Sequence, residues 1–189
     1  MNAPTTKSPV STEESADTLE TERLTLRPLQ ITDAAWVGRE SGRWEVASKL
    51  AFVPSPNPAL AAEMFILAAR ANALNRNDLF RAVIDRATGE GAGIVSATVR
   101  PDGRREFGYW YAPFVWGKGY ATEAGRALLD LAIGAGARSF HAGYFAHNPA
   151  SRRVLEKLGF SHDGDETPLF CTAALKRLPH KGMVLEIRP

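Results

Sequence analysis

The sequence has little cysteine, no long apolar run and no strong excess of either charge, and each shortage excludes a class of protein. Its single cysteine, Cys171, cannot form a disulfide within the chain, which indicates a reducing, cytoplasmic setting. No apolar run approaches the ~20 residues that cross a bilayer, so we expect no membrane partner. A formal net charge of +2 is far below the basic excess of nucleic-acid-binding modules, so we expect no nucleic-acid partner either.

The N-terminus also lacks the apolar core of a signal peptide. Residues 1–17 are rich in Pro, Ser, Thr and Glu, a composition typical of disorder. We therefore expect a disordered tail over residues 1–20 and a single folded domain over residues 21–189. With 44% hydrophobic and 23% charged residues, the chain can form a normal globular core, and no repeat or linker divides it.

Hydrophobic periodicity predicts strands and helices in an informative order. Asp102-Gly103 between two strand-like runs is a strong hairpin signal. Hairpins first, then a β-α-β-α order, predict an α/β (α+β) domain with a mixed sheet flanked by helices. The predicted strands cover 23–29, 79–85, 94–99, 107–111, 139–146 and 184–187, and the predicted helices cover 34–39, 59–73, 120–133 and 149–158.

The most informative segment, Trp116-Gly-Lys-Gly-Tyr-Ala-Thr-Glu123, joins an aromatic strand to a helix. Glycines there let the backbone approach a ligand, and a helix N-terminus suits a phosphate. A simple tight turn explains the two glycines equally well. A Walker loop is excluded, because no Gly-Lys-Ser/Thr closes a preceding glycine spacing. A dinucleotide fingerprint is excluded, because it needs glycine at Thr122.

Residues Gly117 to Ala124 resemble the pyrophosphate-binding turn of GNAT acetyltransferases, most of all in the RimJ/RimL-like branch. The segment Asn148 to Phe160 resembles the second signature of that family, an Asn-x-x-Ser helix start that ends in Lys-Leu-Gly-Phe. The similarity covers roughly residues 107–164. The family pattern often has Gln or Arg where this chain has Trp116.

The resemblance implies a GNAT fold, in which a mixed, mostly antiparallel central sheet is splayed at the cofactor cleft. Acetyl-CoA would lie where strands 106–112 and 139–146 part, and a main-chain N–H within 111–114 would polarise the thioester carbonyl. The implied cofactor-binding residues are Val115, Gly117, Lys118, Gly119, Tyr120, Ala121, Thr122, Asn148, Ser151 and Arg153.

Several of these side chains have an ordinary structural explanation as well. Asn148 precedes Pro149, as a helix N-cap does. Ser151 would protonate the leaving thiolate, or simply lies in the first helical turn. Arg153 and Lys157 share one helix face and would meet the CoA phosphates, or only solvent. Lys118 has the same two explanations.

Glu106, on the aromatic strand, is the candidate general base, and an apolar setting should raise its pKa. The alternative is a structural ion pair with Arg104 or Arg105. His180 is the next candidate base. No histidine pair has metal-ligand spacing, so we expect no metal. Cys171 is interpreted as an ordinary thiol, since direct transfer needs no acyl-enzyme.

The resemblance implies an N-acetyltransferase that moves an acetyl group from acetyl-CoA directly to a primary amine. The acceptor would be bound by the first two helices and the loop before the last strand. A protein N-terminus, an amino acid, a polyamine and an aminoglycoside all stay open as acceptors. A non-catalytic acyl-CoA-binding regulatory module of the same fold is the alternative function. A homodimer also stays open, because the sequence does not reveal the oligomeric state.

Overall fold

The computed structural model describes residues 18–187, so residues 1–17 of the expected tail lie outside the described part. The strands are β1 (Leu19–Glu20), β2 (Leu24–Pro28), β3 (Leu79–Asp85), β4 (Gly91–Val99), β5 (Arg105–Tyr111), β6 (Ser139–Phe145), β7 (Ser161–His162), β8 (Leu169–Cys171), β9 (Lys176–Leu178) and β10 (His180–Glu186). The helices are η1 (Ile31–Asp33), α1 (Ala34–Ser41), α2 (Trp44–Ala47), α3 (Ala59–Arg76), η2 (Pro113–Val115), α4 (Tyr120–Gly134) and α5 (Pro149–Lys157). Among the described helices, none has the length and hydropathy of a membrane span.

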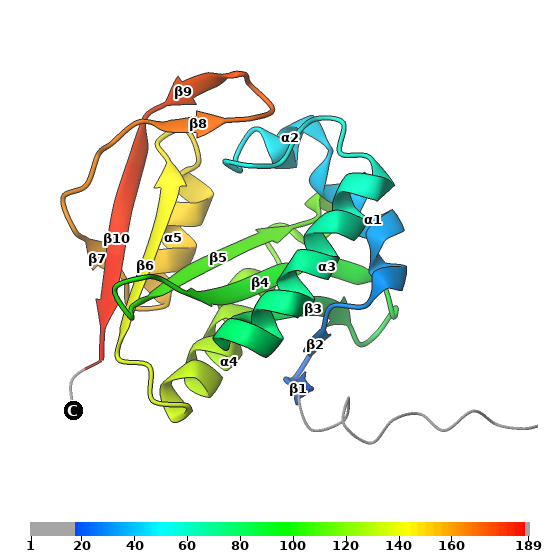
Figure 1. Cartoon of the computed structure of the whole chain (residues 1–189), viewed down its shortest axis with the longest axis horizontal. Helices are drawn as coiled ribbons and strands as arrows, with labels where there is room; N and C mark the ends of the chain where they lie inside the picture. Colours follow the sequence, from blue (N-terminus) through cyan, green and yellow to red (C-terminus); the bar gives the residue numbers. More distant parts are fainter. Residues whose placement is uncertain (1–17, 188–189) are drawn as a thin grey trace, which may run out of the picture.

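One eight-stranded sheet, in the order β1-β2-β3-β4-β5-β6-β10-β7, organises the domain (Figure 1). All of its neighbouring strands are antiparallel except β5 and β6. The parallel β5–β6 register holds only at Arg105↔Phe140 and Glu106↔His141. Beyond these two pairs the strands part, which confirms the predicted mixed, mostly antiparallel sheet with a splay at its centre.

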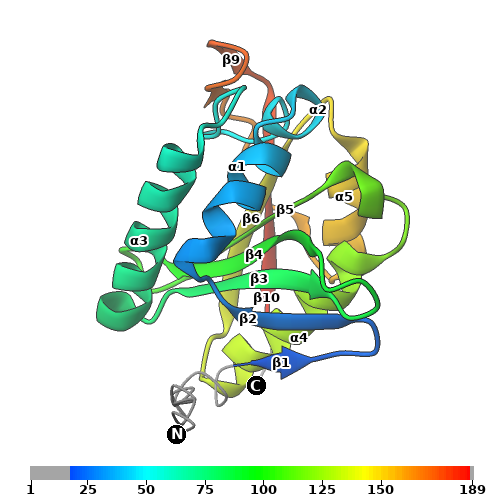
Figure 2. The same ribbon diagram turned by 90° about the vertical axis from the view of Figure 1, so that its right-hand side faces the viewer.

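Helices cover both faces of this sheet (Figure 2). On one face, α4 and α5 build the larger core, which includes Leu128 and Leu155 and takes Phe107 from β5. On the other face, α1 and α3 build a second core, against which Trp110 of β5 packs. Successive β5 side chains therefore serve opposite faces, as a pleated strand requires.

The predicted β4–β5 hairpin forms around Gly103. This residue has φ +81, a left-handed conformation that glycine adopts without strain. Its N–H donates to the Arg100 carbonyl at 3.0 Å, and the Asp102 carboxylate accepts from the Arg104 N–H at 3.1 Å. The turn thus aligns β5 beside β4 and carries Glu106 to the point where the sheet opens.

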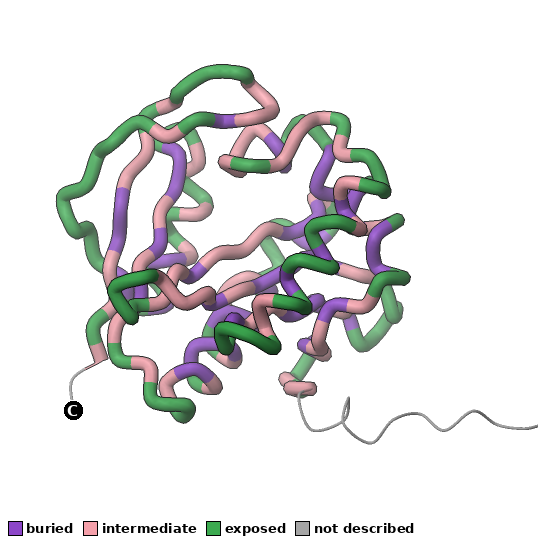
Figure 3. The backbone as a smooth tube through the Cα atoms, viewed as in Figure 1, coloured by how far each residue is buried: buried purple, intermediate pink, exposed green. Residues whose placement is uncertain are grey.

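Some predicted boundaries were wrong. The last strand begins at His180 rather than Val184, so His180 is part of the sheet. Helix α2 and the β8–β9 hairpin were not predicted, since elements of three or four residues show no periodicity. The hairpin is fixed by distant contacts: the Thr172 N–H donates to the Ala51 carbonyl at 2.9 Å, and Cys171 is fully buried. Figure 3 shows the rest of the hairpin as exposed or intermediate.

Candidate active site

The opening between β5 and β6 leaves main-chain groups directed toward it. The Ala112 N–H donates to the Ala92 carbonyl of β4 at 2.8 Å. Hydrogen-bonded and non-bonded pairs alternate along an antiparallel ladder, so Tyr109 and Tyr111 direct their main-chain groups away from β4, toward β6. Past His141, the facing edge of β6 has no partner on β5. The two edges can therefore accept an extended, polar ligand.

The glycine turn follows this opening. Gly117 has φ +77 and Gly119 has φ +83, so both need glycine for their left-handed backbone. Nothing lies within 4 Å of the position that a Cβ on Gly117 would take. Gly119 is the N-cap of α4, and the N–H groups of Tyr120 and Ala121 in the first turn lack intrahelical acceptors. The turn presents open backbone and a helix dipole, which suits a phosphate.

A cluster that the sequence analysis missed holds this turn. The Glu123 carboxylate accepts from the Arg23 main-chain N–H at 2.9 Å, the Arg23 Nε at 2.8 Å and the Thr21 hydroxyl at 2.6 Å. Arg23 also donates to the Lys118 carbonyl at 2.7 Å. Burial would raise the Glu123 pKa, but these hydrogen bonds outweigh burial and hold it below its usual value. The start of the domain therefore fixes the glycine turn.

Trp116 has a structural role in place of the family's Gln or Arg. Its indole Nε1 donates to the Tyr111 carbonyl at 2.8 Å, which ties the turn to the end of β5. The Lys49 ammonium lies 4.1 Å from the centre of its ring, a cation–π contact with the segment after α2. Val115 is buried in the core, so only its main chain could reach a cofactor.

The second signature meets β5 through a tyrosine. Asn148 caps α5 by accepting from the Ser151 N–H at 3.3 Å, as predicted. The Ser151 Oγ lies 2.9 Å from the Tyr109 hydroxyl, which is also 3.1 Å from the Ser151 carbonyl. Burial raises the pKa of Tyr109 to about 12, so its phenol stays protonated at neutral pH. The contact between Tyr109 and Ser151 could have been predicted only by knowing that β5 packs against α5.

The cationic candidates are more loosely placed. Arg153 and Lys157 are exposed on α5, and within residues 18–187 neither side chain forms an ion pair. Lys118 is exposed in the turn. The structure therefore brings Ser151 to β5 but brings none of these three cations onto a shared partner.

Glu106 lies in a setting that differs from the expected apolar one. Its carboxylate forms an ion pair with Arg100, and its side chain is 44% exposed. The pairing partner also differs from both predicted ones. Arg104 instead binds Asp102 at 2.7 Å, and Arg105 donates to main-chain carbonyls. The apolar environment was wrong because the β4–β5 hairpin turns Arg100 back toward the strand.

His180 is partly buried on the same face of the sheet. It pairs in register with Phe145 and packs edge-on against the Phe145 ring at 5.8 Å. A Cβ on Gly143 would lie 2.3 Å from the imidazole, so this glycine makes room for the ring. Burial lowers the pKa of His180, against smaller opposite effects of Asp165, Glu106 and Asp163. The imidazole is therefore neutral near pH 7 and close enough to Glu106 to sense its charge.

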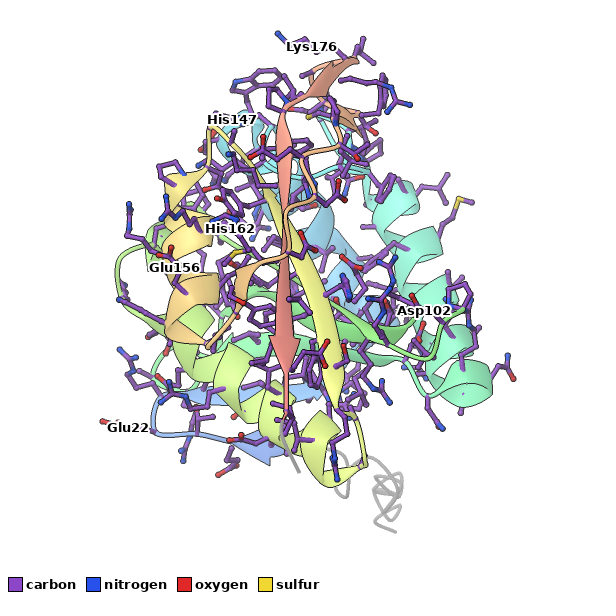
Figure 4. The ribbon with its side chains drawn as sticks, turned by 90° about the vertical axis from the view of Figure 1, so that its left-hand side faces the viewer. Glu22, Asp102, His147, Glu156, His162 and Lys176 are labelled. Atoms are coloured by element: carbon purple, nitrogen blue, oxygen red, sulfur yellow. The ribbon has the colours of Figure 1, made fainter. Side chains whose placement is uncertain are left out.

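Helix α2 and the β8–β9 hairpin meet above this end of the sheet. The imidazole Nε2 of His147 lies 3.0 Å from the Ser48 carbonyl, which links the end of β6 to the segment after α2. Figure 4 shows Lys176, the first residue of β9, above His147, which follows the end of β6. Trp44 on α2 and Phe170 on β8 are exposed by 58% and 43%.

Comparison with known proteins agrees with this geometry. Residues 23–161 match the family model described as an acetyltransferase (GNAT) domain. The chain is 28% identical over 151 residues to the uncharacterized N-acetyltransferase p20 of Bacillus licheniformis, an alignment that covers 78% of this chain and 84% of that protein.

Solved structures of low identity share the fold. Ribosomal-protein-S5-alanine acetyltransferase from Vibrio fischeri matches with a TM-score of 0.77 at 20% identity, over 91% of this chain and 99% of that one. RimJ from Mycobacterium smegmatis, in complex with CoA-disulfide, matches with a TM-score of 0.73 at 22% identity, over 86% of this chain and 81% of that one. The predicted fold is confirmed, and the structures that share it include the branch that the two motifs resemble.

Proposed function

This chain belongs to the GNAT acetyltransferase family and is an N-acetyltransferase; from that premise we propose how its own residues divide the reaction. The donor is acetyl-CoA and the acceptor is a primary amine, which attacks directly with no acyl-enzyme. The observation that carries the assignment is the pair of unpaired strand edges that leads straight into the glycine turn.

The residues around the opening fit acetyl-CoA. The main-chain N–H groups from Gly117 to Thr122 hold the pyrophosphate, because no atom lies within 4 Å of a Cβ position on Gly117 and only the Arg23 guanidinium, at 3.4 Å, lies near that of Gly119. The edge of β5 at Tyr109 and at the Tyr111 N–H pairs with the amide-bearing arm of the cofactor, since the Tyr111 carbonyl already accepts from Trp116. Within residues 18–187, the buried Tyr111 hydroxyl has no hydrogen-bond partner, which is consistent with a polar group arriving there. Bound acetyl-CoA supplies a thioester, whose acyl carbon an amine can attack.

Ser151 and Tyr109 act on the leaving-group side. The Tyr109 hydroxyl lies within hydrogen-bond distance of both the Ser151 carbonyl and the Ser151 Oγ, and when it donates to Oγ the serine Oγ–H is free to point toward the departing sulfur. Ser151 is then the proton donor, and Tyr109 positions it.

The acceptor side uses His180 as the proton acceptor. Its imidazole is neutral near pH 7, and a neutral imidazole can take the proton that the attacking amine loses. The Glu106 carboxylate, already balanced by Arg100, is less suited to that task. Together with Asp163 and Asp165, Glu106 attracts the cationic form of the amine before it is deprotonated.

The acceptor enters beside α2 and the β8–β9 hairpin. Exposed aromatic residues on both elements favour an amine attached to a peptide or another partly apolar group. The related Vibrio fischeri enzyme is named for a protein N-terminus, so peptides are the first acceptors to test.

An acetyl-CoA-dependent thiol-release assay tests the assignment. Purified protein is offered peptides with free N-termini, amino acids, polyamines and aminoglycosides, and each peptide has a control with a blocked N-terminus. We expect release with at least one free amine and none with its blocked counterpart. If acetyl-CoA binds but no amine raises release above background, the chain is instead a non-catalytic acyl-CoA-binding module.

A further inference from the structure

Helix α3 carries an apolar seam on its outward face. Leu60, Met64, Leu67 and Leu74 are exposed by 67%, 65%, 58% and 86%. With the exposed Ala71 between them, these residues follow a spacing of four, three, four and three, which is the a/d repeat of a coiled coil. Figure 3 shows the outward turns of α3 as exposed.

This seam is additional to the face that α3 already uses. The helix packs on the domain through Ala62, Ile66 and Ala69, which are almost fully buried. A helix with one core-facing stripe normally carries polar residues on the opposite side. Single exposed leucines are common, but a row of apolar side chains over four turns marks a contact surface.

We propose that the seam pairs with the seam of a second copy of this chain, with the two α3 helices antiparallel. In an antiparallel pair, a and d positions face each other across the axis. That register places Leu60 against Ala71 of the second copy and Met64 against Leu67 of the second copy. In the outer layers, the large Leu60 side chain meets the small Ala71 side chain of the second copy. The two-fold symmetry of the dimer produces each of these pairs twice.

Charges on the flank of the seam favour the same register. Glu63 and Arg70 occupy the g positions, and this register brings Glu63 of one copy beside Arg70 of the other, twice. Within residues 18–187, Glu63 forms no ion pair. Arg70 uses one N–H on the Leu29 carbonyl at 2.9 Å and keeps further donors, since a guanidinium has five. The opposite flank is small, with Ala61 facing Ala68 of the second copy.

The expected dimer is of modest affinity. In this register the paired part of the seam runs from Leu60 to Ala71 and is roughly 16.5 Å long at 1.5 Å per residue, and Leu74 lies beyond it. One helix pair of that length buries less than a standard protein interface, so we expect a dissociation constant on the order of micromolar. The seam faces away from the sheet, and the glycine turn belongs to the opposite side of the domain (Figure 2). Acetyl-CoA affinity should therefore be the same in monomer and dimer.

Sedimentation velocity over a range of concentrations tests the surface. The full chain should shift from monomer to dimer as its concentration rises, and Leu67→Glu should raise the dissociation constant at least about tenfold, because it places two like charges beside the axis. Leu175→Glu, at a site 79% exposed on the β8–β9 hairpin, is the matched control and should dimerise normally. A parent chain that stays monomeric at every concentration, or a dimer that Leu67→Glu leaves intact, overturns the proposal.

A charge exchange tests the register. Glu63→Arg alone should weaken the dimer, because it places two arginines together. Adding Arg70→Glu should restore the dimer to within a few-fold of the parent, since the pair is re-formed with its signs reversed. Circular dichroism and acetyl-CoA binding confirm that each variant is folded. Failure of the double exchange to recover any affinity over Glu63→Arg overturns the antiparallel pairing.

Discussion

Two regions of the molecule are specified in different ways. The donor region, residues 105–160, carries strong short-range signals: Asn148 accepts from the N–H three positions on, and Gly119 is the N-cap of α4. One distant residue, Arg23, also holds its turn. The acceptor region, residues 31–76 and 161–186, depends on contacts between distant segments. Thr172 bonds Ala51 across 121 positions of the sequence. The first region can be identified from motifs, whereas the second exists only once the chain has folded.

This difference has a chemical counterpart. The proposed donor, acetyl-CoA, carries a pyrophosphate and amide groups, which main-chain groups and glycines can hold. The acceptor must be distinguished from other amines, and in the proposed site that selection falls to exposed side chains such as Trp44 and Phe170. Substitutions in the donor region should therefore change affinity for one known ligand, while those in the acceptor region change which amine reacts and how fast.

The largest expected effect lies in the acceptor region. His180→Asn removes the proposed proton acceptor and should lower turnover by about two orders of magnitude, the usual scale for general-base catalysis. Because burial lowers the His180 pKa, the parent should gain activity as the pH rises through that pKa and imidazolium becomes imidazole. The pH–rate profile of the variant should lack this acid limb.

Glu106→Gln is the companion variant, because it keeps the shape of the side chain and removes its charge. Its main effect should be a higher KM for a cationic acceptor, with the acid limb retained. A variant that loses the limb and about two orders of magnitude in turnover would show that Glu106 is the base after all. That result would support the sequence-based prediction that Glu106 is the general base.

The second prediction concerns the donor region. Gly119→Val should raise the dissociation constant for acetyl-CoA by at least about tenfold, because a Cβ is strained at φ +83 and would lie 3.4 Å from the Arg23 guanidinium that holds the phosphate-binding turn. Gly136→Val is the matched control at the other end of α4. It has φ +96 and open space around it, so it carries the same backbone strain away from the ligand. Calorimetry that finds equal affinity in both variants contradicts the phosphate assignment.

The sequence predicted the backbone elements of the donor region, whereas its cofactor contacts stay a prediction. The glycine turn, the Asn148 cap and the parting strands all follow from local rules on helix ends and strand pairing, together with a motif resemblance. In the acceptor region α1 and α3 were predicted, whereas α2 and β8 were too short to show periodicity and β10 extends beyond its pattern. His180 was therefore placed before the last strand, although it begins that strand.

Electrostatic environment was harder to predict than position. Glu106 lies on β5 as expected, but its partner Arg100 comes from the far side of a turn, and sequence distance ranked Arg104 and Arg105 ahead of it. The Thr21–Arg23–Glu123 cluster was missed for the same reason, since it joins segments 100 positions apart. Which charges meet is decided by strand pairing, and a local pattern does not contain that information.

The smallest effect should come from the contact between Ser151 and Tyr109. A thiol has a pKa of about 8.5, so the cofactor sulfur can depart as a thiolate. Protonating this sulfur therefore lowers the barrier less than deprotonating the amine does. Ser151→Ala should therefore lower turnover by roughly tenfold at saturating substrates, with little change in acetyl-CoA affinity.

Tyr109→Phe keeps the ring and removes only the hydroxyl that orients Ser151, so its loss of turnover should be smaller, about a few-fold. Because Tyr109 acts through Ser151, the double variant should match Ser151→Ala alone, whereas independent roles would multiply the two losses. Tyr144→Phe, whose hydroxyl faces His162 rather than Ser151, is the control and should leave turnover unchanged.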